Sequence, residues 1–477
     1  MKRLALIPSL LAVALAGCAQ IPHIQPQVTA IAPATLGLAQ AEAPIAERWW
    51  DAFGDPQLDR LIDAGLADNP SLEAALARLR VAQATVSSEH AGLLPQVGID
   101  AGVTHERFPD HYLIPPPFAG TNQNIATTQA GLSWDLDLFG RQRARVSAAK
   151  AAVDAAGFDA AAARLAISTA IAQAYIGLAR TDQQIVVARG FVATREQSLA
   201  YIRARKSSNL ASDFDMRTAE TLLAQARQAE VRAQQQHDVL IHALAALVGK
   251  GADFYGTITP PTLALGTTPV VPDVLPADLI GRRPDLLAGQ ARISEAEAGR
   301  KVARADFLPN VNLQAFTGLA AIGFGQFLTS GATTYGGGAA IHVPIFEGGR
   351  LTANYKAATG ELDIAVADYN TSVLGAVRET ADALTLVRSA DADLAQQNLV
   401  VAGLRDTVRL DQVRISSGLG SRLDAIDSGF RLLEAEQALI DLQADALAKR
   451  IQLIAALGGG FDPHHPLVST TKVESRS

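Results

Sequence analysis

The only cysteine of this 477-residue chain stands where its neighbours specify a covalent modification. A basic start, Met1-Lys-Arg3, precedes an apolar core, and Leu15-Ala-Gly-Cys18 is typical of a lipoprotein cleavage box. We therefore expect residues 1–17 to be a signal peptide, and Cys18 to carry a diacylglycerol on its sulfur and an acyl chain on its nitrogen. No second thiol exists for a disulfide. The alternative is an incidental cysteine in a signal peptide that is cut elsewhere.

Other reactive side chains are not arranged for catalysis. His237 and His242 are five positions apart, so one helix face cannot present both to zinc, and Gly249-Lys250 lacks the upstream glycine of a phosphate-binding loop. We interpret these as surface histidines and a helix end, and His464-His465 as part of a solvated tail. The sequence therefore predicts no enzyme, no metal site and no cofactor apart from the lipid on Cys18.

Charge and composition limit the partners and describe the start of the mature chain. Removing Lys2 and Arg3 with the signal peptide changes the formal charge from −7 to −9, so nucleic acid is not expected as a partner. Residues 18–46 are rich in Pro, Ala, Thr and Gln, which predicts an extended, lipid-anchored tether. Trp49 and Trp50 follow it. We expect them to be a packed anchor, and a ligand platform is the alternative.

Two long proline-free stretches must position whatever site the chain contains. One runs from Phe118 to Pro260 and the other from Pro344 to Pro463, and helix-forming residues dominate both. Each carries a seam with a spacing of seven, and the seams are 209 positions apart: Ile171, Leu178, Ile185, Val192 and Leu199, then Thr380, Val387, Leu394, Val401 and Val408. This duplication predicts two coiled-coil hairpins, 141–248 and 349–457, with long helices of about 90 to 100 Å.

Both seams end at turn-forming clusters, which we predict to be hairpin tips. The first comprises Ser207, Ser208, Asn209 and Leu210, and the second comprises Ser416, Ser417, Gly418 and Leu419. Arg, Asp, Glu and Gln are expected in every turn of these helices. The hairpins should therefore stand in water and not cross a bilayer.

Four segments alternate apolar and polar residues, as strands with one apolar face do: 96–106, 125–138, 310–319 and 333–346. A soluble sandwich would show the same alternation, but strands of about ten residues in a lipidated export product favour a transmembrane barrel. Four strands cannot close a barrel, and about eight leave a filled lumen. Three copies with twelve strands are therefore the smallest assembly with an open interior and no exposed edges.

These elements define a duplicated chain. It divides into a signal peptide (1–17), a lipid-anchored tether (18–46), a first repeat (47–258), a linker (259–274), a second repeat (275–460) and a polar tail (461–477). The predicted fold class is mainly α with a membrane β-barrel. Each protomer of a trimer would contribute four strands, and a long coiled-coil tunnel would continue the barrel.

Several short motifs resemble one known family. They are the lipoprotein box, Trp49-Trp50 with Asp55-Pro56, Asp135-Leu-Asp-Leu-Phe-Gly-Arg141, Gly281-Arg-Arg-Pro-Asp285, Leu308-Pro309 and Pro344-Ile-Phe346. Together they are similar to the TolC-like outer membrane factors of tripartite efflux systems, in particular the lipoprotein branch of NodT and OprM type. The resemblance extends over essentially the whole mature chain.

The resemblance implies a homotrimer in which twelve strands form a shared barrel in outer membrane lipid, continued by a periplasmic helical tunnel. It also implies passive export of drugs or other small molecules, driven by an inner-membrane pump of RND type that is reached through a periplasmic adaptor, the membrane fusion protein. Ala19 after the cysteine implies sorting to the Gram-negative outer membrane. A periplasmic adaptor, a coiled-coil scaffold and a channel for secreted proteins are the alternatives.

The family also implies where the channel closes. Aligned through Gly418, the constriction positions are Leu423 and Asp427, with Asp424 close by, and the two tips would bind the adaptor. Three copies of Asp427 would create an acidic ring, which favours cations in pores. The alternative is a solvated helix carboxylate. Phe430 stands where OprM-type relatives carry a basic residue, so an ionic latch is not expected there.

Overall fold

The computed structural model describes residues 21–32, 36, 45–111, 113–267, 269 and 279–462. The signal peptide, Cys18 and nearly all of the predicted tail lie outside these residues. The chain folds into two compact units, each of which combines segments of both repeats. The first consists of Met1–Ala30, Arg78–Ala156 and Gly289–Tyr369, and the second of Ile31–Ala77, Gly157–Ala288 and Asn370–Ser477.

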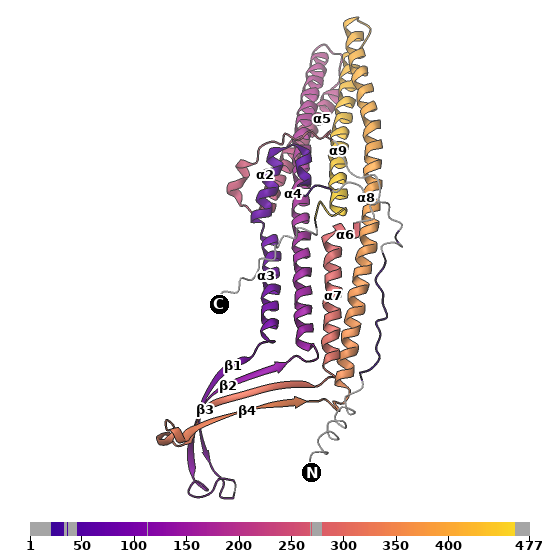
Figure 1. Ribbon diagram of the computed structural model, residues 1–477. Helices are drawn as coiled ribbons and strands as arrows, with labels where there is room; N and C mark the ends of the chain where they lie inside the picture. Colours follow the sequence, from indigo (N-terminus) through magenta and orange to yellow (C-terminus); the bar gives the residue numbers. More distant parts are fainter. Residues whose placement is uncertain are drawn as a thin grey trace. The chain divides into compact units, whose positions relative to one another are not determined.

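The first unit contains an antiparallel sheet of four strands. Their order is β1 (Gln96–Arg107), β2 (Asn122–Leu136), β3 (Asn310–Ile322) and β4 (Thr333–His342) (Figure 1). Val97 lies opposite Leu132, and Leu132 lies opposite Ala315, so the register places apolar residues on one face and polar residues on the other. Among the described residues, the outer edges of β1 and β4 have no partner strand.

The ends of the strands differ from the predicted ones. β2 ends at Leu136 and not at 138, because the Asp137 carboxylate accepts hydrogen bonds from the backbone N–H of Gln142 (3.0 Å) and Arg143 (2.9 Å) and so caps the following helix. β4 ends at His342 and not at 346, since Pro344 has no N–H for the ladder. The other differences are small: β1 ends at 107, β2 begins at 122 and β3 ends at 322.

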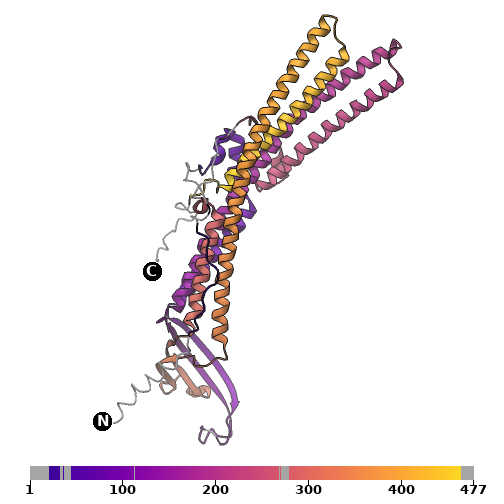
Figure 2. The same cartoon turned by 90° about the vertical axis from the view of Figure 1, so that its right-hand side faces the viewer.

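Each repeat continues into a helical hairpin, and the two hairpins have the same lengths. α4 (Arg141–Ser207) and α8 (Arg350–Ser416) have 67 residues each, whereas α5 (Asp213–Leu247) and α9 (Arg422–Ala456) have 35 each. Every boundary of the second hairpin lies 209 positions after its counterpart. At 1.5 Å per residue, α4 and α8 are each about 100 Å long. Figure 2 shows both hairpins, with their tips at the same end of the second unit.

The predicted seams are largely buried in the second unit. Ile171, Leu178, Ile185 and Leu199 of the first seam and Thr380, Val387 and Val401 of the second are buried. One related prediction is wrong, because Arg, Asp, Glu and Gln do not recur in every turn of α4: none stands between Arg164 and Gln173. An 18-residue window of this helix has a mean hydropathy of 1.2, enough by length and composition alone to cross a membrane, but 44% of it is buried inside the protein. We interpret this stretch as a core helix.

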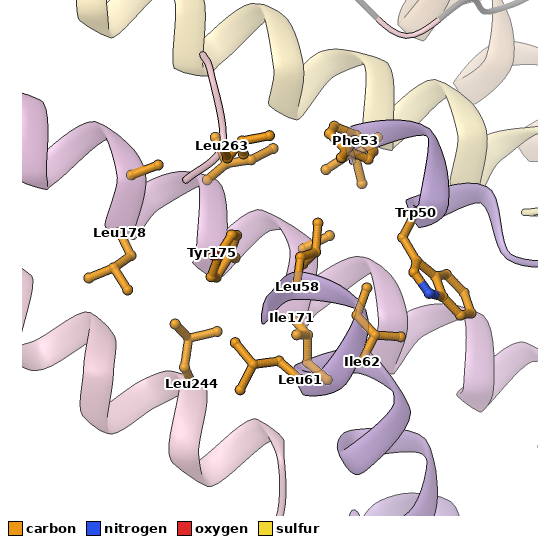
Figure 3. Packing of buried hydrophobic residues seen from close by; sticks show 14 of the residues in the cluster. Trp50, Phe53, Leu58, Leu61, Ile62, Ile171, Tyr175, Leu178, Leu244 and Leu263 are labelled. Atoms are coloured by element: carbon orange, nitrogen blue, oxygen red, sulfur yellow. The ribbon is translucent and has the colours of Figure 1, made fainter. Parts of the chain in front are cut away.

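The core of the second unit forms where α2 (Pro56–Asp68) and the short helix η2 (Trp49–Phe53) pack on α4 (Figure 3). Trp49 and Trp50 are 3% and 2% exposed, and their rings meet edge to face at 5.7 Å. The prediction of a packed anchor is therefore confirmed. Buried partners in the same cluster include Phe53, Leu58, Ile62, Tyr175, Leu244 and Leu263.

Shorter helices complete the described elements. They are α3 (Pro70–Ala91), α6 (Leu279–Arg282) and α7 (Pro284–Ala305), with the 3-10 helices η3 (Ala252–Thr257), η4 (Phe324–Gln326) and η5 (Ser330–Ala332).

Residues 21–30 of the predicted tether form no helix or strand, but they pack on the helices of the first unit, to which they belong. The backbone N–H groups of Gln27 and Val28 donate to the Asp363 carboxylate of α8 at 2.8 and 3.0 Å. Arg300 of α7 donates to the carbonyl of Ile24 at 2.6 Å. The side chain of Ile24 packs on a cluster that contains Phe307 and Tyr355. This part of the tether is therefore a bound strap.

Candidate functional site

At the first predicted tip, the helix ends in a regular C-terminal capping motif. α4 ends at Ser207, and Asn209 has a positive φ of 57°. The N–H of Asn209 donates to the carbonyl of Lys206 (2.9 Å), and the N–H of Leu210 donates to the carbonyl of Arg205 (2.8 Å). These two bonds define a Schellman motif, which satisfies carbonyls that the end of the helix leaves without partners.

The second tip repeats this motif 209 positions later. Gly418 has a φ of 70°, and its N–H donates to the carbonyl of Ile415 (3.0 Å), while the N–H of Leu419 donates to that of Arg414 (2.8 Å). Both motifs place a leucine immediately after the left-handed residue. Leu210 is 65% exposed and Leu419 is 76% exposed. The two tips therefore present equivalent apolar side chains to the surroundings.

The serines of the tips have a different role. Ser207 donates through its hydroxyl to the carbonyl of Ala204 at 2.7 Å, and Ser416 donates to that of Val413 at 2.8 Å. Ser208 and Ser417 donate to the same two carbonyls, at 3.4 and 2.9 Å. These hydroxyl protons are used within the chain, so the leucines are the better candidates for contact with a partner.

The predicted constriction residues lie in the first two turns of α9. Leu423 is half-buried, and its N–H donates to the Ser421 hydroxyl that caps the helix, at 3.1 Å. Asp424 and Asp427 are exposed. The Asp427 carboxylate pairs with Arg431, one turn further along the helix, at 2.8 Å. Because both side chains are exposed, this pair contributes little to stability, but it places a cation beside the predicted acidic ring.

Phe430 is part of a contact that the sequence did not indicate. Its ring lies 4.9 Å from that of Phe191, and the Arg195 guanidinium lies 3.7 Å from the Phe430 centroid. Burial lowers the pKa of Arg195, and the carboxylates of Glu434 and Asp427 act in the opposite direction. A basic side chain from α4 therefore lies beside this position and makes a cation–π contact with Phe430.

Further contacts between α4 and α9 continue along the same faces. Gln184 donates to the Asp441 carboxylate at 2.6 Å. Gly190 lies against Leu433, so closely that a Cβ on the glycine would be 3.0 Å from a leucine methyl carbon. We call the contacts of Gln184, Gly190, Phe191 and Arg195 with α9 the α4–α9 clasp. They join residues far apart in the sequence, and no local pattern marks them.

His237 is less exposed than the surface interpretation expects. This side chain is only 17% exposed, and it bridges Asp182 of α4 (3.2 Å) and Asp238 (3.0 Å). Burial raises the pKa of Asp182, and His237 acts in the opposite direction. His242 is exposed and packs on Tyr255, with ring centroids 4.4 Å apart. In the part of the chain that the structure describes, no cluster of three or more His, Cys, Asp or Glu could hold a metal ion. His464-His465 lies outside it.

The motif from Asp135 to Arg141 closes the junction between strands and helices in the first unit. Besides the cap made by Asp137, the Asp135 carboxylate accepts from Asn312 at 2.7 Å, and Arg141 pairs with Asp306 at 3.6 Å. Burial alone would raise the pKa of Asp137, but hydrogen bonds from two backbone N–H groups and the Arg143 guanidinium lower it overall. Asp135, Asp137 and Arg141 line a cavity of about 330 Å³, and their contacts hold the junction together.

Two long hairpins with equivalent tips, and strands with one apolar face, are the elements that a barrel-and-tunnel membrane channel requires. Comparison with known proteins agrees: residues 61–250 and 275–459 match the outer membrane efflux protein family, and the chain belongs to it. It is 31% identical to the probable efflux pump outer membrane protein SepC of Pseudomonas putida, over 95% of this chain and 96% of that one. It is also 31% identical to the fusaric acid resistance protein FusA of Burkholderia cepacia, over 94% and 86% of the two chains.

Solved structures show the same fold. The outer membrane protein VceC of Vibrio cholerae is 31% identical, with a TM-score of 0.79 over 88% of this chain and all of that one. The predicted family resemblance and the predicted fold class are therefore confirmed, and the protein is an outer membrane efflux channel. An adaptor and a coiled-coil scaffold are excluded. The family consists of transport components, which fits the prediction that the protein is not an enzyme.

Proposed function

We propose that three copies of the chain close a twelve-stranded barrel and export small organic molecules delivered by a periplasmic adaptor and an RND-type inner-membrane pump. The observation that carries this proposal is the four-stranded sheet, which has one apolar face, one polar face and, within the described part of the chain, two edges without a partner strand. Lipid cannot satisfy a bare strand edge, and pairing β1 of one copy with β4 of the next removes both edges. Polar residues then face the lumen.

The relatives indicate the class of cargo. Similar proteins include a toluene efflux pump outer membrane protein, TtgF, a solvent efflux pump outer membrane protein, SrpC, and the fusaric acid resistance protein FusA. Toluene and fusaric acid are small and aromatic. We propose that this channel likewise exports small, partly apolar organic compounds, including drugs.

The α4–α9 clasp supports a proposal for the closed state. Leu423 and Asp427 lie on α9, and the clasp holds this helix against α4 through Phe430. Opening would then require α9 to leave α4 and break the contacts of Arg195 and Gln184. In this proposal Leu423 forms an apolar narrowing, and Asp427 with its partner Arg431 sets the charge of the periplasmic entrance.

Electron microscopy of the detergent-extracted protein tests the assembly. Particles viewed down their long axis should be rings with threefold symmetry and a hollow centre. Dimers or open filaments would contradict the proposal, because neither gives a closed barrel with an open lumen.

We expect Cys18→Ala to prevent lipidation and cleavage by the lipoprotein signal peptidase. The reason is that Cys18 carries the only thiol of the chain, within a lipoprotein box. Labelling with a radioactive fatty acid measures the result, and Ala19→Ser is a control that should keep the label. Export should fall but not vanish, since the barrel also anchors the protein. Equal label in Cys18→Ala and wild type would contradict the prediction.

Substitutions at the constriction should have separate effects in single-channel recordings. Asp427→Ala should reduce the preference for cations, because it removes a carboxylate and leaves Arg431 unpaired. Arg431→Gln is the matched variant and should increase that preference. Leu423→Ala should raise the conductance and keep the selectivity. If Asp427→Ala has the selectivity of wild type, Asp427 is a solvated carboxylate and Asp424 becomes the candidate for the acidic ring.

A further inference from the structure

The polar face of the sheet carries one residue of an unexpected type. On β3 this face presents Asn310, Asn312, Gln314, Phe316 and Gly318, and the facing positions of β1, β2 and β4 are mostly polar residues and glycines. Phe316 is the only Phe, Tyr or Trp on the polar face of the four described strands. The other large apolar side chains there, Ile125 and Ile322, lie opposite each other at the far end of the strands.

Glycines surround Phe316 on both sides. In the register of the sheet, Gly98 lies opposite Gly131, Gly131 opposite Phe316, and Phe316 opposite Gly336. A Cβ added at Gly336 would be 2.8 Å from two carbon atoms of the Phe316 ring, so the ring lies directly on the backbone of β4. Only glycine permits so close an approach.

The other side of the ring is open. A Cβ added at Gly131 or Gly98 would have no atom of a non-neighbouring residue within 4 Å, and Phe316 itself is 36% exposed. Neighbouring strands are about 4.8 Å apart, so the bare backbone of β1 and β2 beside the ring is about as wide as one small aromatic molecule. A solute lying there would contact the edge or face of Phe316, an arrangement that aromatic pairs favour.

We infer that Phe316 and the glycines beside it form a binding platform for planar aromatic solutes on the inner wall of the barrel. This inference rests on the proposed function, because it requires a closed barrel with the polar face inside. Each channel then has three such platforms at one level, within a lumen that is otherwise lined mostly by polar residues and glycines. A solute leaving the helical tunnel would pause at this level before its release.

Two probes of equal charge and similar size test the inference in single-channel recordings. Benzyltrimethylammonium has an aromatic ring, and cyclohexylmethyltrimethylammonium has a saturated one. In wild type, we expect the aromatic probe to interrupt the current about three to ten times longer than the saturated probe. Phe316→Leu keeps an apolar side chain but removes the ring, and the two probes should then give equal interruptions. The inference is overturned if wild type does not discriminate, or if Phe316→Leu still does.

Two controls are needed. One distinguishes a probe that binds in the lumen from a probe that acts from the lipid side, and the other distinguishes displacement of the ring from general damage to the barrel. Tyr335 lies on the apolar face next to this row, so Tyr335→Leu should keep the discrimination. If Tyr335→Leu abolishes it, the probe acts from the membrane and the inference is overturned. Gly336→Ala should displace the ring and shorten the long interruptions, whereas Gly338→Ala has free space and should not. The inference also fails if the two glycine variants behave alike. A preparation without threefold rings or conductance would instead contradict the proposed function.

Discussion

The double variant Leu210→Asp with Leu419→Asp should abolish export while leaving trimers intact. Both leucines are exposed at the ends of rigid hairpins, and each is held by the same backbone motif. Apolar side chains in this position suit end-to-end packing with the helical hairpins of an adaptor. Burying two carboxylates per protomer in that interface would cost several kcal/mol in each of three copies, enough to prevent assembly.

Loss of drug resistance in cells that lack the native channel is the measurement for this prediction. The leucines are better targets than Gly418, because any side chain at its φ of 70° is strained and would change the tip itself. Val81→Asp is a suitable control, since it places the same charge at an exposed apolar position of α3. Unchanged resistance in the double variant, with normal trimer content, would show that the adaptor binds elsewhere.

The second large effect concerns Asp55, and we expect Asp55→Ala to destabilise the fold by about 3–4 kcal/mol. This carboxylate is 1% exposed. It accepts from the backbone N–H groups of Gln57 (2.9 Å) and Leu58 (3.3 Å), which caps α2. It also accepts from the Tyr175 hydroxyl (2.9 Å) and from the N–H and hydroxyl of Thr262 (3.1 and 3.0 Å). Removing it leaves several buried donors without an acceptor.

Chemical or thermal unfolding, followed by circular dichroism in detergent, measures this loss. Asp63→Ala is the matched control in the same helix, because Asp63 is exposed and pairs with the exposed Arg48 (2.7 Å). Its effect should stay within about 0.5 kcal/mol. Equal effects of the two substitutions would mean that the hydrogen bonds accepted by Asp55 do not hold α2, α4 and the linker together.

Because of the Asp55 carboxylate, the stability of the fold should depend on pH. Burial by itself would raise the pKa of Asp55, but the hydrogen bonds from Tyr175, Gln57, Leu58 and Thr262 lower it overall. Its stabilising contribution is therefore complete above the unfolded pKa of about 4 and is lost as the pH falls through the lower folded value. The difference in unfolding free energy between wild type and Asp55→Asn should shrink below about pH 4. If this free-energy difference does not change with pH, the lowered pKa of Asp55 does not contribute to stability as expected.

The sequence alone determined the parts of this protein that repeat locally. A spacing of seven and an offset of 209 positions predicted two equal hairpins, and every helix boundary of the second hairpin lies at that offset from its counterpart in the first. The alternation of apolar and polar residues likewise predicted four strands with one apolar face, because side chains in a strand alternate strictly between its faces. Such patterns depend only on the geometry of one element, so they can be recognised without a fold.

Tertiary structure decided which distant side chains meet. No local pattern placed Arg195 on Phe430, His237 between two carboxylates, or the ring of Phe316 on Gly336. The binding of the strap was equally unpredictable from local patterns, because this segment has little periodicity and is held by Asp363 and Arg300 from two different helices. Each of these contacts depends on the register between two elements, and register is set by packing over the whole interface. That is why the helices and strands could be predicted from the chain, whereas the clasp and the aromatic platform required the folded protein.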